Sequence, residues 1–300
     1  MREELFKNCT LCPRKCNVNR LEGKRGYCGM DGTIRAARAA LHMWEEPCIS
    51  GKKGSGAVFF SGCGLRCCFC QNRDIAIGDS GKEISVERLA EIFLELQEKG
   101  AANLNLVTGA HYVPHIISAL ELARGKEMNL PVVYNSSGYE SVETIRRLDG
   151  YVDVYLPDMK YMEPELAAAF SNARDYPQAA QSAIAEMMRQ TGPCPFAEDG
   201  YIKRGTIVRH LILPGHTKNS IAVLKYLYRT YGEDIFISVM NQYTPVWKNE
   251  KFPELNRKVT RREYEKVLDA AIELGIENGY FQEGETAEES FIPAFDYEGV

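Results

Sequence analysis

The chain has 300 residues, of which 45% are hydrophobic and 26% are charged, and its formal net charge is −5. This composition suits one large or two medium globular domains, excludes wholesale disorder and disfavours a generally basic nucleic-acid-binding surface. The first residues are charged and form no signal peptide, and no apolar run approaches the about 20 residues that cross a membrane. We therefore expect a cytoplasmic protein, in which clustered cysteines indicate metal or redox chemistry before disulfides.

The cysteines are unevenly distributed along the chain. The first group comprises Cys9, Cys12, Cys16 and Cys28, and the second comprises Cys63, Cys67, Cys68 and Cys70. From this distribution we predict a Cys-rich, metal-binding N-terminal extension at residues 1–50, a core domain at 51–285 and a C-terminal tail at 286–300. The tail is acidic and irregular, and we expect it to be solvated and loosely packed.

From residue 57 onward, short apolar segments alternate with amphipathic ones. Strands are predicted at AVFFS, NLNLVTG, LPVVYNSSG, YVDVYLPDMK, TIVRHLILPG and DIFISVMNQYTP. Helices are predicted at SVERLAEIFLELQEKG, VPHIISALELARG, SVETIRRLDG, a longer insert at about 163–191, SIAVLKYLYRTYG and TRREYEKVLDAAIELG. Ser85 is expected to cap the first of these helices, and Thr260 with Glu263 to form a capping box on the last. About six strand–helix units favour a parallel sheet or barrel, whose functional residues gather where the strands end.

The second cysteine group follows the first of these strands. Cys63, Cys67 and Cys70 are spaced C-x3-C-x2-C. Structural zinc needs four ligands, which this loop can supply only through the adjacent Cys67 and Cys68, whose side chains diverge. Three thiolates suit three irons of a [4Fe–4S] cube instead, and the fourth iron then remains open to a substrate or cofactor.

The segment CGLRCCFC, with Phe69 as its aromatic residue, resembles the signature of the radical S-adenosylmethionine (SAM) superfamily. The longer segment VFFSGCGLRCCFCQN is similar to the branch that contains pyruvate formate-lyase activating enzyme and its uncharacterised homologues. The resemblance runs from about residue 44 to 282. It implies an α/β fold, a partial (β/α)6 TIM-like barrel, with a SAM-binding [4Fe–4S] cluster on Cys63, Cys67 and Cys70, while Cys68 lies outside the pattern.

The resemblance also implies a reaction. An electron donor such as flavodoxin or ferredoxin reduces the cluster, SAM is cleaved to methionine and a 5′-deoxyadenosyl radical, and that radical abstracts hydrogen from a substrate. We first expect a protein or peptide substrate, including a partner protein on which a glycyl radical is formed. Radical modification of a small molecule or nucleobase is the rival within the superfamily, and a noncatalytic zinc-binding scaffold is the rival outside it. We expect neither a membrane nor a nucleic acid as partner.

SAM contacts are implied at the ends of several strands. Family members show a Gly-Gly-Glu-type motif after the second strand, where this chain has TGAHY, so that only Gly109 matches. Thr108 or His111 would then supply the polar contact, although His111 also suits a helix start with no ligand role. After the third strand, YNSSGY resembles the family's Asn-Gly turn and directs Asn135 and Ser137 at the SAM ribose.

Three later strands complete the implied set. Asp158 and Lys160 resemble the Asp-x-Lys of activating enzymes, which lies beside SAM. Arg209 occupies the family's Arg-containing strand, near the SAM carboxylate or ribose, and the adjacent His210 is expected on the opposite face. Gln242 stands, with Tyr243, where family members present a histidine to adenine.

The first cysteine group reads C-x2-C-x3-C-x11-C. Four cysteines form a closed ligand set, which suits a structural zinc ion or a second [4Fe–4S] cluster. Activases with extra clusters place two such sets after the SAM motif, whereas this chain has one set before it. The sequence therefore leaves zinc and iron–sulfur open.

Overall fold

The computed structural model describes residues 4–78, 80–282 and 293–300. These residues form a nine-stranded sheet of order β3-β1-β2-β4-β5-β6-β7-β8-β9. The strands are β1 (Ile34–His42), β2 (Ser55–Phe60), β3 (Lys82–Ile84), β4 (Leu104–Val107), β5 (Val132–Ser136), β6 (Val154–Pro157), β7 (Gly205–Leu211), β8 (Phe236–Met240) and β9 (Gly279–Phe281). From β2 through β4 to β9 all pairs are parallel, which confirms the predicted α/β fold. The sheet is open, because β3 and β9 lie at its two ends.

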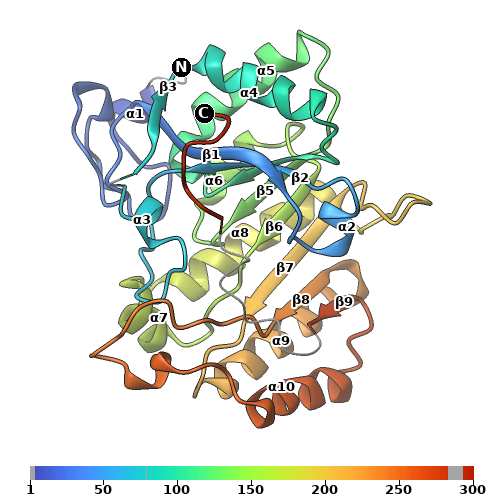
Figure 1. The fold of residues 1–300 in the computed structure, drawn as a ribbon. Coiled ribbons are helices and arrows are strands. Elements are labelled where there is room, and N and C mark those ends of the chain that lie inside the picture. The colour runs from blue at the N-terminus through green and yellow to red at the C-terminus, as the bar shows by residue number, and fades with distance from the viewer. Residues whose placement is uncertain (1–3, 79, 283–292) are drawn as a thin grey trace.

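Ten α-helices connect and cover these strands in the described part of the chain (Figure 1). They are α1 (Glu4–Lys7), α2 (Pro47–Ser50), α3 (Arg73–Ala76), α4 (Val86–Glu98), α5 (Val113–Arg124), α6 (Val142–Arg147), α7 (Pro164–Ser171), α8 (Tyr176–Thr191), α9 (Thr217–Tyr231) and α10 (Arg261–Leu274). The insert predicted at about 163–191 forms two helices, α7 and α8. Asn172 adopts a left-handed conformation (φ 48°) and ends α7, because an Asn tolerates this backbone better than most residues.

The predicted helix starts are confirmed where a side chain caps the backbone. The Ser85 hydroxyl accepts a hydrogen bond from the Arg88 N–H at the start of α4. Thr260 and Glu263 form a complete capping box at the start of α10. Each cap satisfies helix N–H groups that have no partner within the helix.

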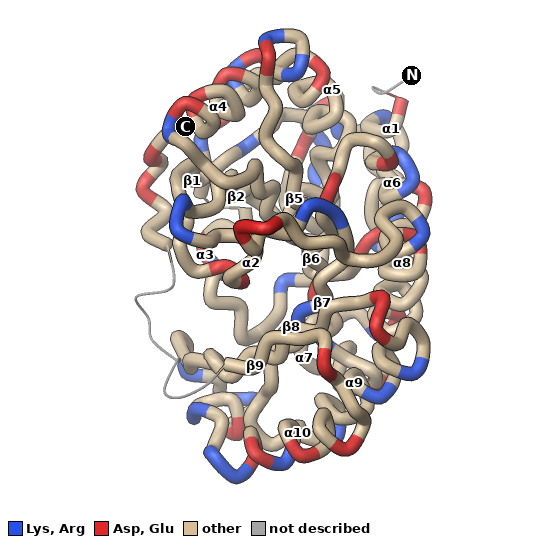
Figure 2. The backbone as a smooth tube through the Cα atoms, turned by 90° about the vertical axis from the view of Figure 1, so that its right-hand side faces the viewer, with Lys and Arg blue, Asp and Glu red and all other residues tan. Residues whose placement is uncertain are grey.

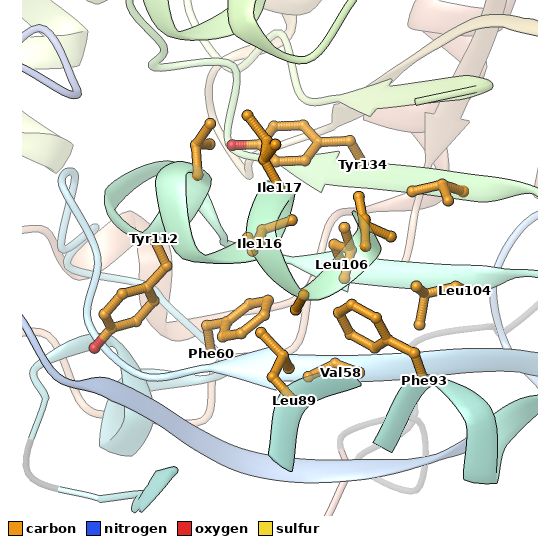
Figure 3. Packing of buried hydrophobic residues seen from close by; sticks show 14 of the residues in the cluster. Val58, Phe60, Leu89, Phe93, Leu104, Leu106, Tyr112, Ile116, Ile117 and Tyr134 are labelled. Carbon is orange, nitrogen blue, oxygen red and sulfur yellow. The ribbon is translucent and has the colours of Figure 1, made fainter. Parts of the chain in front are cut away.

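A continuous apolar core fills the space between the sheet and the helices α4 and α5. Figure 3 shows side chains from β2, β4, α4 and α5 packed against one another. The fully buried members at this contact include Val58, Phe60, Leu89, Phe93, Leu104, Leu106 and Ile116. Burial on this scale holds β2 and β4 rigid, and the polar loops after these strands therefore start from fixed positions.

Strand β1 lies inside the segment that the sequence assigned to the N-terminal extension, yet it belongs to the main sheet. It pairs antiparallel with both β2 and β3. The described part of the C-terminal tail lies against β1 as well, although its side chains are exposed or half-buried. Ala39 N–H donates to the Glu298 carbonyl (2.8 Å), and Arg38 forms an ion pair with Asp296 (2.7 Å). The predicted boundary at 285/286 falls outside the described residues.

Basic and acidic residues are interspersed along the helices, as the colours of the backbone tube in Figure 2 show and as the small net charge predicts. Across residues 4–78, 80–282 and 293–300, every helix is too short or too polar to traverse a lipid bilayer.

Candidate functional site

A cavity of about 340 Å³ lies between the cysteine loop that follows β2 and the polar residues of β4 to β9. Its volume falls within the range of about 300–1,000 Å³ typical of small-molecule sites. Ten residues singled out by the sequence line it: Cys63, Cys67, Cys70, Thr108, Asn135, Ser137, Asp158, Lys160, Arg209 and Gln242. Residues spread over 180 positions of sequence therefore meet at one site.

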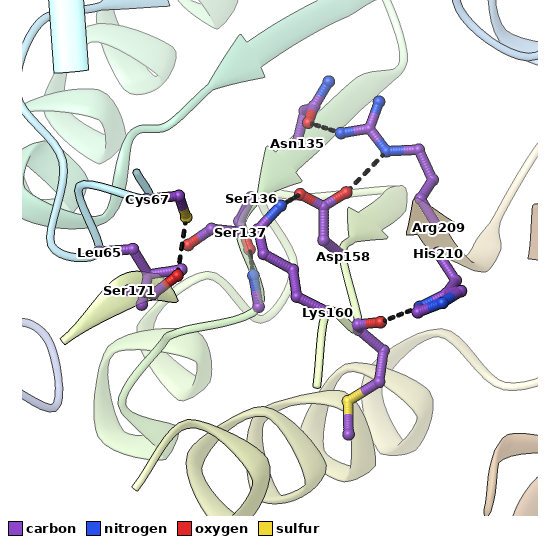
Figure 4. A network of polar contacts seen from close by, with 12 residues as sticks. Leu65, Cys67, Asn135, Ser136, Ser137, Asp158, Lys160, Ser171, Arg209 and His210 are labelled. Carbon is purple, nitrogen blue, oxygen red and sulfur yellow. Dashed lines mark hydrogen bonds and ion pairs between the residues drawn. The ribbon is translucent and has the colours of Figure 1, made fainter. Parts of the chain in front are cut away.

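The cysteine loop is held from several sides. Arg66 takes a left-handed conformation (φ 53°), and the Cys70 N–H donates to the Cys67 carbonyl (3.1 Å), so the loop turns tightly. The Ser171 hydroxyl donates to the Cys67 Sγ (3.0 Å), as Figure 4 shows. The Trp247 indole N–H donates to the Cys70 carbonyl (3.1 Å). The positions of the thiols are thus fixed by contacts with distant parts of the chain.

Lys160 and Arg209 converge on the Asp158 carboxylate (Figure 4). The Lys160 ammonium lies 2.6 Å from one carboxylate oxygen, and the Arg209 Nε lies 3.2 Å from the other. Burial alone raises the pKa of Asp158, but the two cations outweigh it and the pKa falls below its ordinary value. Burial lowers the pKa of Lys160, but Asp158 reverses this and raises it. All three groups therefore stay charged at neutral pH.

Two glutamates that sequence reasoning missed also line the cavity. Glu45 accepts hydrogen bonds from Arg209 (3.1 Å), Asn105 (2.9 Å) and Asn135 (3.2 Å). Glu46 is 8% exposed. Both come from the short segment between β1 and α2, whose sequence, MWEE, is typical of an ordinary solvated turn. No local pattern signals that this turn folds inward.

The turn after β4 was predicted as a SAM contact through Thr108, Gly109 or His111. Thr108 lines the cavity and has a left-handed backbone (φ 60°), a strained conformation for a β-branched residue and one typical of functional sites. Gly109 and His111 do not line it. His111 is buried, and its Nε2 lies 2.7 Å from the Ser61 carbonyl. Burial lowers the pKa of His111 to about 3, which indicates a neutral packing residue.

His210 also lies away from the cavity, as the alternation of strand β7 predicts. Its Nδ1 lies 2.7 Å from the Met159 carbonyl (Figure 4), while the adjacent Arg209 faces inward. Gly138 has a positive φ of 75°, and a Cβ there would overlap the Asp158 carbonyl. The close approach of the turn after β5 to the end of β6 therefore requires glycine.

Sequence comparison decides the family of the chain. The model of the radical SAM superfamily matches residues 57–227, more than half of the chain, and includes the cysteine loop. The chain belongs to the radical SAM superfamily.

Other comparisons add relatives. The chain is 30% identical over 276 residues to an uncharacterized protein of Methanocaldococcus jannaschii, covering 90% of this chain and 75% of the relative. It is 26% identical over 113 residues to the pyruvate formate-lyase-activating enzyme of Clostridium pasteurianum, covering 36% of this chain and 46% of that protein. The solved structure of Streptococcus suis SuiB has a TM-score of 0.46 and 13% identity, covering 77% of this chain and 48% of that one. The chain thus spans about half the length of that structure.

The residues at the cavity fit the [4Fe–4S] cluster that the radical SAM family implies. Burial raises the pKa of Cys70 to about 12 and, together with the neighbouring thiols, raises that of Cys67. Bare thiolates are therefore unfavourable here, and thiolates bound to iron carry less charge. Cys63, Cys67 and Cys70 share the cavity wall, whereas Cys68 lies in a neighbouring recess and donates its backbone N–H to the Phe170 carbonyl (2.8 Å). Three thiols thus face the cavity of this radical SAM chain.

The N-terminal cysteine group lies next to the cysteine loop that follows β2. Burial raises the pKa of Cys12 to about 12, and the nearby Cys28 and Cys9 add to the rise. A Cβ on Gly64, in the cysteine loop that follows β2, would lie 3.6 Å from the Cys12 Sγ. Among the described residues, no three Cys, His, Asp or Glu side chains are arranged around a single metal ion.

Arg14 links the two cysteine groups. Its guanidinium donates to the carbonyls of Gly64 (2.7 Å), Asn172 (2.5 Å) and Ser171 (3.0 Å). It also stacks over the Tyr27 ring at 4.0 Å. Arg14, which lies between Cys12 and Cys16, therefore connects the cysteine loop that follows β2 to the C-terminal end of α7.

Proposed function

We propose that this chain reductively cleaves SAM and uses the resulting radical to abstract hydrogen from a substrate. The observation that carries the proposal is that three thiols and the Asp158–Lys160–Arg209 network line one cavity. When bound on Cys63, Cys67 and Cys70, the cluster would supply the electron and the open iron for cleavage of the SAM sulfonium bond.

The chain's own residues would bind and orient SAM and shield the radical from water. Asp158 and Arg209 present fixed charges for the amino and carboxylate groups of SAM, and Lys160 holds Asp158 ionised. Thr108, Asn135, Ser137 and Gln242 supply neutral hydrogen-bonding groups along the same wall. Gly109 and His111 shape the turn behind Thr108 and make no direct contact in this proposal. The buried lining limits access of water to the reacting radical.

We propose a protein or peptide as the substrate, including a glycine that becomes a glycyl radical. The similarity over 113 residues to a pyruvate formate-lyase-activating enzyme supports this choice. Radical modification of a small molecule or nucleobase remains the alternative. A noncatalytic zinc scaffold is disfavoured, because it gives no reason for the buried charge network in front of the thiols.

One experiment tests the reaction. Anaerobically reconstituted protein is incubated with SAM and dithionite, and 5′-deoxyadenosine and methionine are quantified. We expect both products from the wild type and neither from Cys63→Ala, while Cys68→Ala serves as the matched control and keeps forming them. Absence of 5′-deoxyadenosine from iron-loaded wild type would refute the proposed reaction. Electron paramagnetic resonance on a candidate partner then tests the glycyl radical separately.

We propose a small acidic electron-transfer protein, such as a flavodoxin or ferredoxin, as the electron donor. Cys67, Cys68 and Cys70 line a second recess outside the cavity, together with four cations and one carboxylate: Arg66, Arg73, Lys248, Lys251 and Glu250. A basic recess directly behind ligand cysteines complements an acidic carrier, even though the whole chain is acidic. The reduced carrier would lose one electron and the cluster would gain it.

Charge reversal tests this docking surface. In Lys248→Glu/Lys251→Glu, we expect the ratio of flavodoxin-driven to dithionite-driven SAM cleavage to fall at least tenfold. The matched control is Lys99→Glu/Lys126→Glu, because these exposed residues follow α4 and α5, at the opposite edge of the sheet. If this ratio fell equally in both double variants, the recess would be excluded as the docking site.

We also propose that Cys9, Cys12, Cys16 and Cys28 bind zinc or a second [4Fe–4S] cluster. Cys9 and Cys28 are buried, Cys12 and Cys16 are half-buried, and the neighbouring thiols help to raise the pKa values of Cys12 and Cys28, which supports a shared metal centre. Counts of iron and zinc on anaerobically purified wild type and Cys12→Ala decide between the two metals. No change in either count on substitution would refute the site.

A further inference from the structure

Two carboxyl groups in the cavity, those of Glu45 and Glu46, make no direct contact with SAM in the proposed function. Both residues enter the cavity from the segment that follows β1. His42, at the end of β1, pairs with Ser55, at the start of β2, whereas the cysteine loop follows the other end of β2. The two glutamates therefore reach the cavity from the edge of the sheet opposite to the cysteines.

The two carboxylates differ in their partners. Glu45 is satisfied by Arg209, Asn105 and Asn135. The Ser238 hydroxyl lies close enough to the Glu46 carboxyl group to lower its pKa, but the buried Oε2 atom of Glu46 has no hydrogen-bond partner among the residues that the structure describes. A buried carboxylate oxygen without a partner costs stability, and a protein retains one where a ligand supplies the missing donor.

The charges that face the cavity favour a cation. Apart from the cysteines, its ionisable lining comprises Glu45, Glu46, Asp158, Lys160, Arg209, His42 and Tyr280. Burial, with help from the nearby Arg209, lowers the pKa of His42 and keeps it neutral, and burial raises the pKa of Tyr280. The lining thus holds three carboxyl groups and two cations. Burial raises the pKa of Glu46 although the nearby Arg209 opposes the rise, and an approaching cation would favour the ionised form of this carboxyl group.

We propose that Glu46 is a substrate-binding residue, held beside the Arg209 network by Glu45, and that it binds a protonated nitrogen of the substrate, an ammonium or a guanidinium group. This inference rests on the proposed function, because it assigns SAM to the cysteine end and the substrate to the opposite end. Within that function it narrows the substrate class to molecules that carry a cationic nitrogen. A lysine or arginine side chain of a peptide has this chemistry.

Three small probes test the proposal on reconstituted holoprotein with SAM present: butylammonium, butylguanidinium and the neutral pentanamide. Isothermal titration calorimetry at pH 7 measures their binding to the wild type, Glu46→Gln and Glu46→Asp. We expect the wild type to bind at least one cation tenfold or more tightly than pentanamide. Glu46→Gln should abolish this preference, and Glu46→Asp, which keeps the charge, should retain part of it.

Glu98→Gln is the matched control, because Glu98 is exposed at the end of α4 and lines neither the cavity nor the basic recess. It should bind the probes as the wild type does. Equal binding of cations and pentanamide, or an unchanged preference in Glu46→Gln, would overturn the proposal. So would a loss of SAM affinity in Glu46→Gln as large as the loss of cation affinity, because Glu46 would then contact SAM.

The proposed function and the cation site are tested by different measurements. If iron-loaded wild type forms no 5′-deoxyadenosine, the proposed SAM cleavage is refuted. The binding heats of the three probes would still show whether Glu46 binds a cation.

Discussion

Replacing Arg14 with alanine tests whether the N-terminal extension stabilises the cysteine loop that follows β2. The substitution removes three hydrogen bonds at once, to Gly64 in the loop and to Ser171 and Asn172 at the end of α7. Ser171 in turn donates to the Cys67 Sγ. The loop would therefore lose both a direct and an indirect support.

The magnitude follows from these contacts. A hydrogen bond to a charged group contributes about 1.5–3 kcal/mol. The bonds to Gly64 and Ser171 are half-buried, while the bond to Asn172 is exposed and is omitted. Two bonds at the lower bound predict a loss of about 3 kcal/mol in the free energy of unfolding. Arg14→Lys should lose less, since one ammonium can still reach part of the set.

Urea unfolding measures the free energy, and the rate of iron release to a chelator reports on the loop itself. The control is Arg174→Ala, because Arg174 is 70% exposed and its ion pair with Glu165 lies at the surface. A surface pair contributes about 0–1 kcal/mol, so this variant should resemble the wild type in both assays. If Arg14→Ala unfolds and releases iron as the control does, the support that we assign to Arg14 is wrong.

Three further predictions concern other residues. Cys63→Ala should lose iron from the reconstituted protein while Cys68→Ala retains it, as measured by iron and sulfide analysis; loss in both would place Cys68 among the ligands. Burial raises the pKa of Glu140 to about 8, so the folded state holds this proton up to higher pH than the unfolded state. The free energy of unfolding should therefore fall as pH rises from about 4.5 to about 8, by up to about 1.4 kcal/mol per pH unit, and Glu140→Gln should flatten that fall in urea titrations; a parallel fall in the variant would contradict it. Thr260→Ala removes the capping box of α10 and should lower the melting temperature through a loss of about 1 kcal/mol, whereas an unchanged melting temperature would show that this helix end contributes nothing.

Much of the fold could be predicted because its signals are local. The apolar periodicity of α4 and the capping box of α10 each lie within one stretch of sequence, and both appear in the structure. The cysteine spacing predicts a shared site for the same reason. Parallel strands then bring their polar ends to one edge of the sheet, so Asn135, Asp158 and Arg209 meet.

The rest depends on contacts between distant segments. The sequence of β1, IRAARAALH, is rich in alanine, which favours helices, and it is extended only because β2 and β3 pair with it on both sides. Glu46 follows this strand and could be placed only once β1 was known to lie between β3 and β2 in the sheet. The polar ring of His111 faces inward because the Ser61 carbonyl, 50 residues away, accepts its hydrogen bond.

The contacts that complete the cysteine loop also constrain when the site can form during synthesis. Arg14 reaches Asn172, 158 residues later, and Trp247 reaches Cys70 across 177 residues. A ribosome has therefore released most of the chain before the loop acquires all of its neighbours. Iron inserted earlier would meet a loop that lacks these supports, so insertion of the proposed cluster should follow, rather than accompany, synthesis of the chain as far as Trp247.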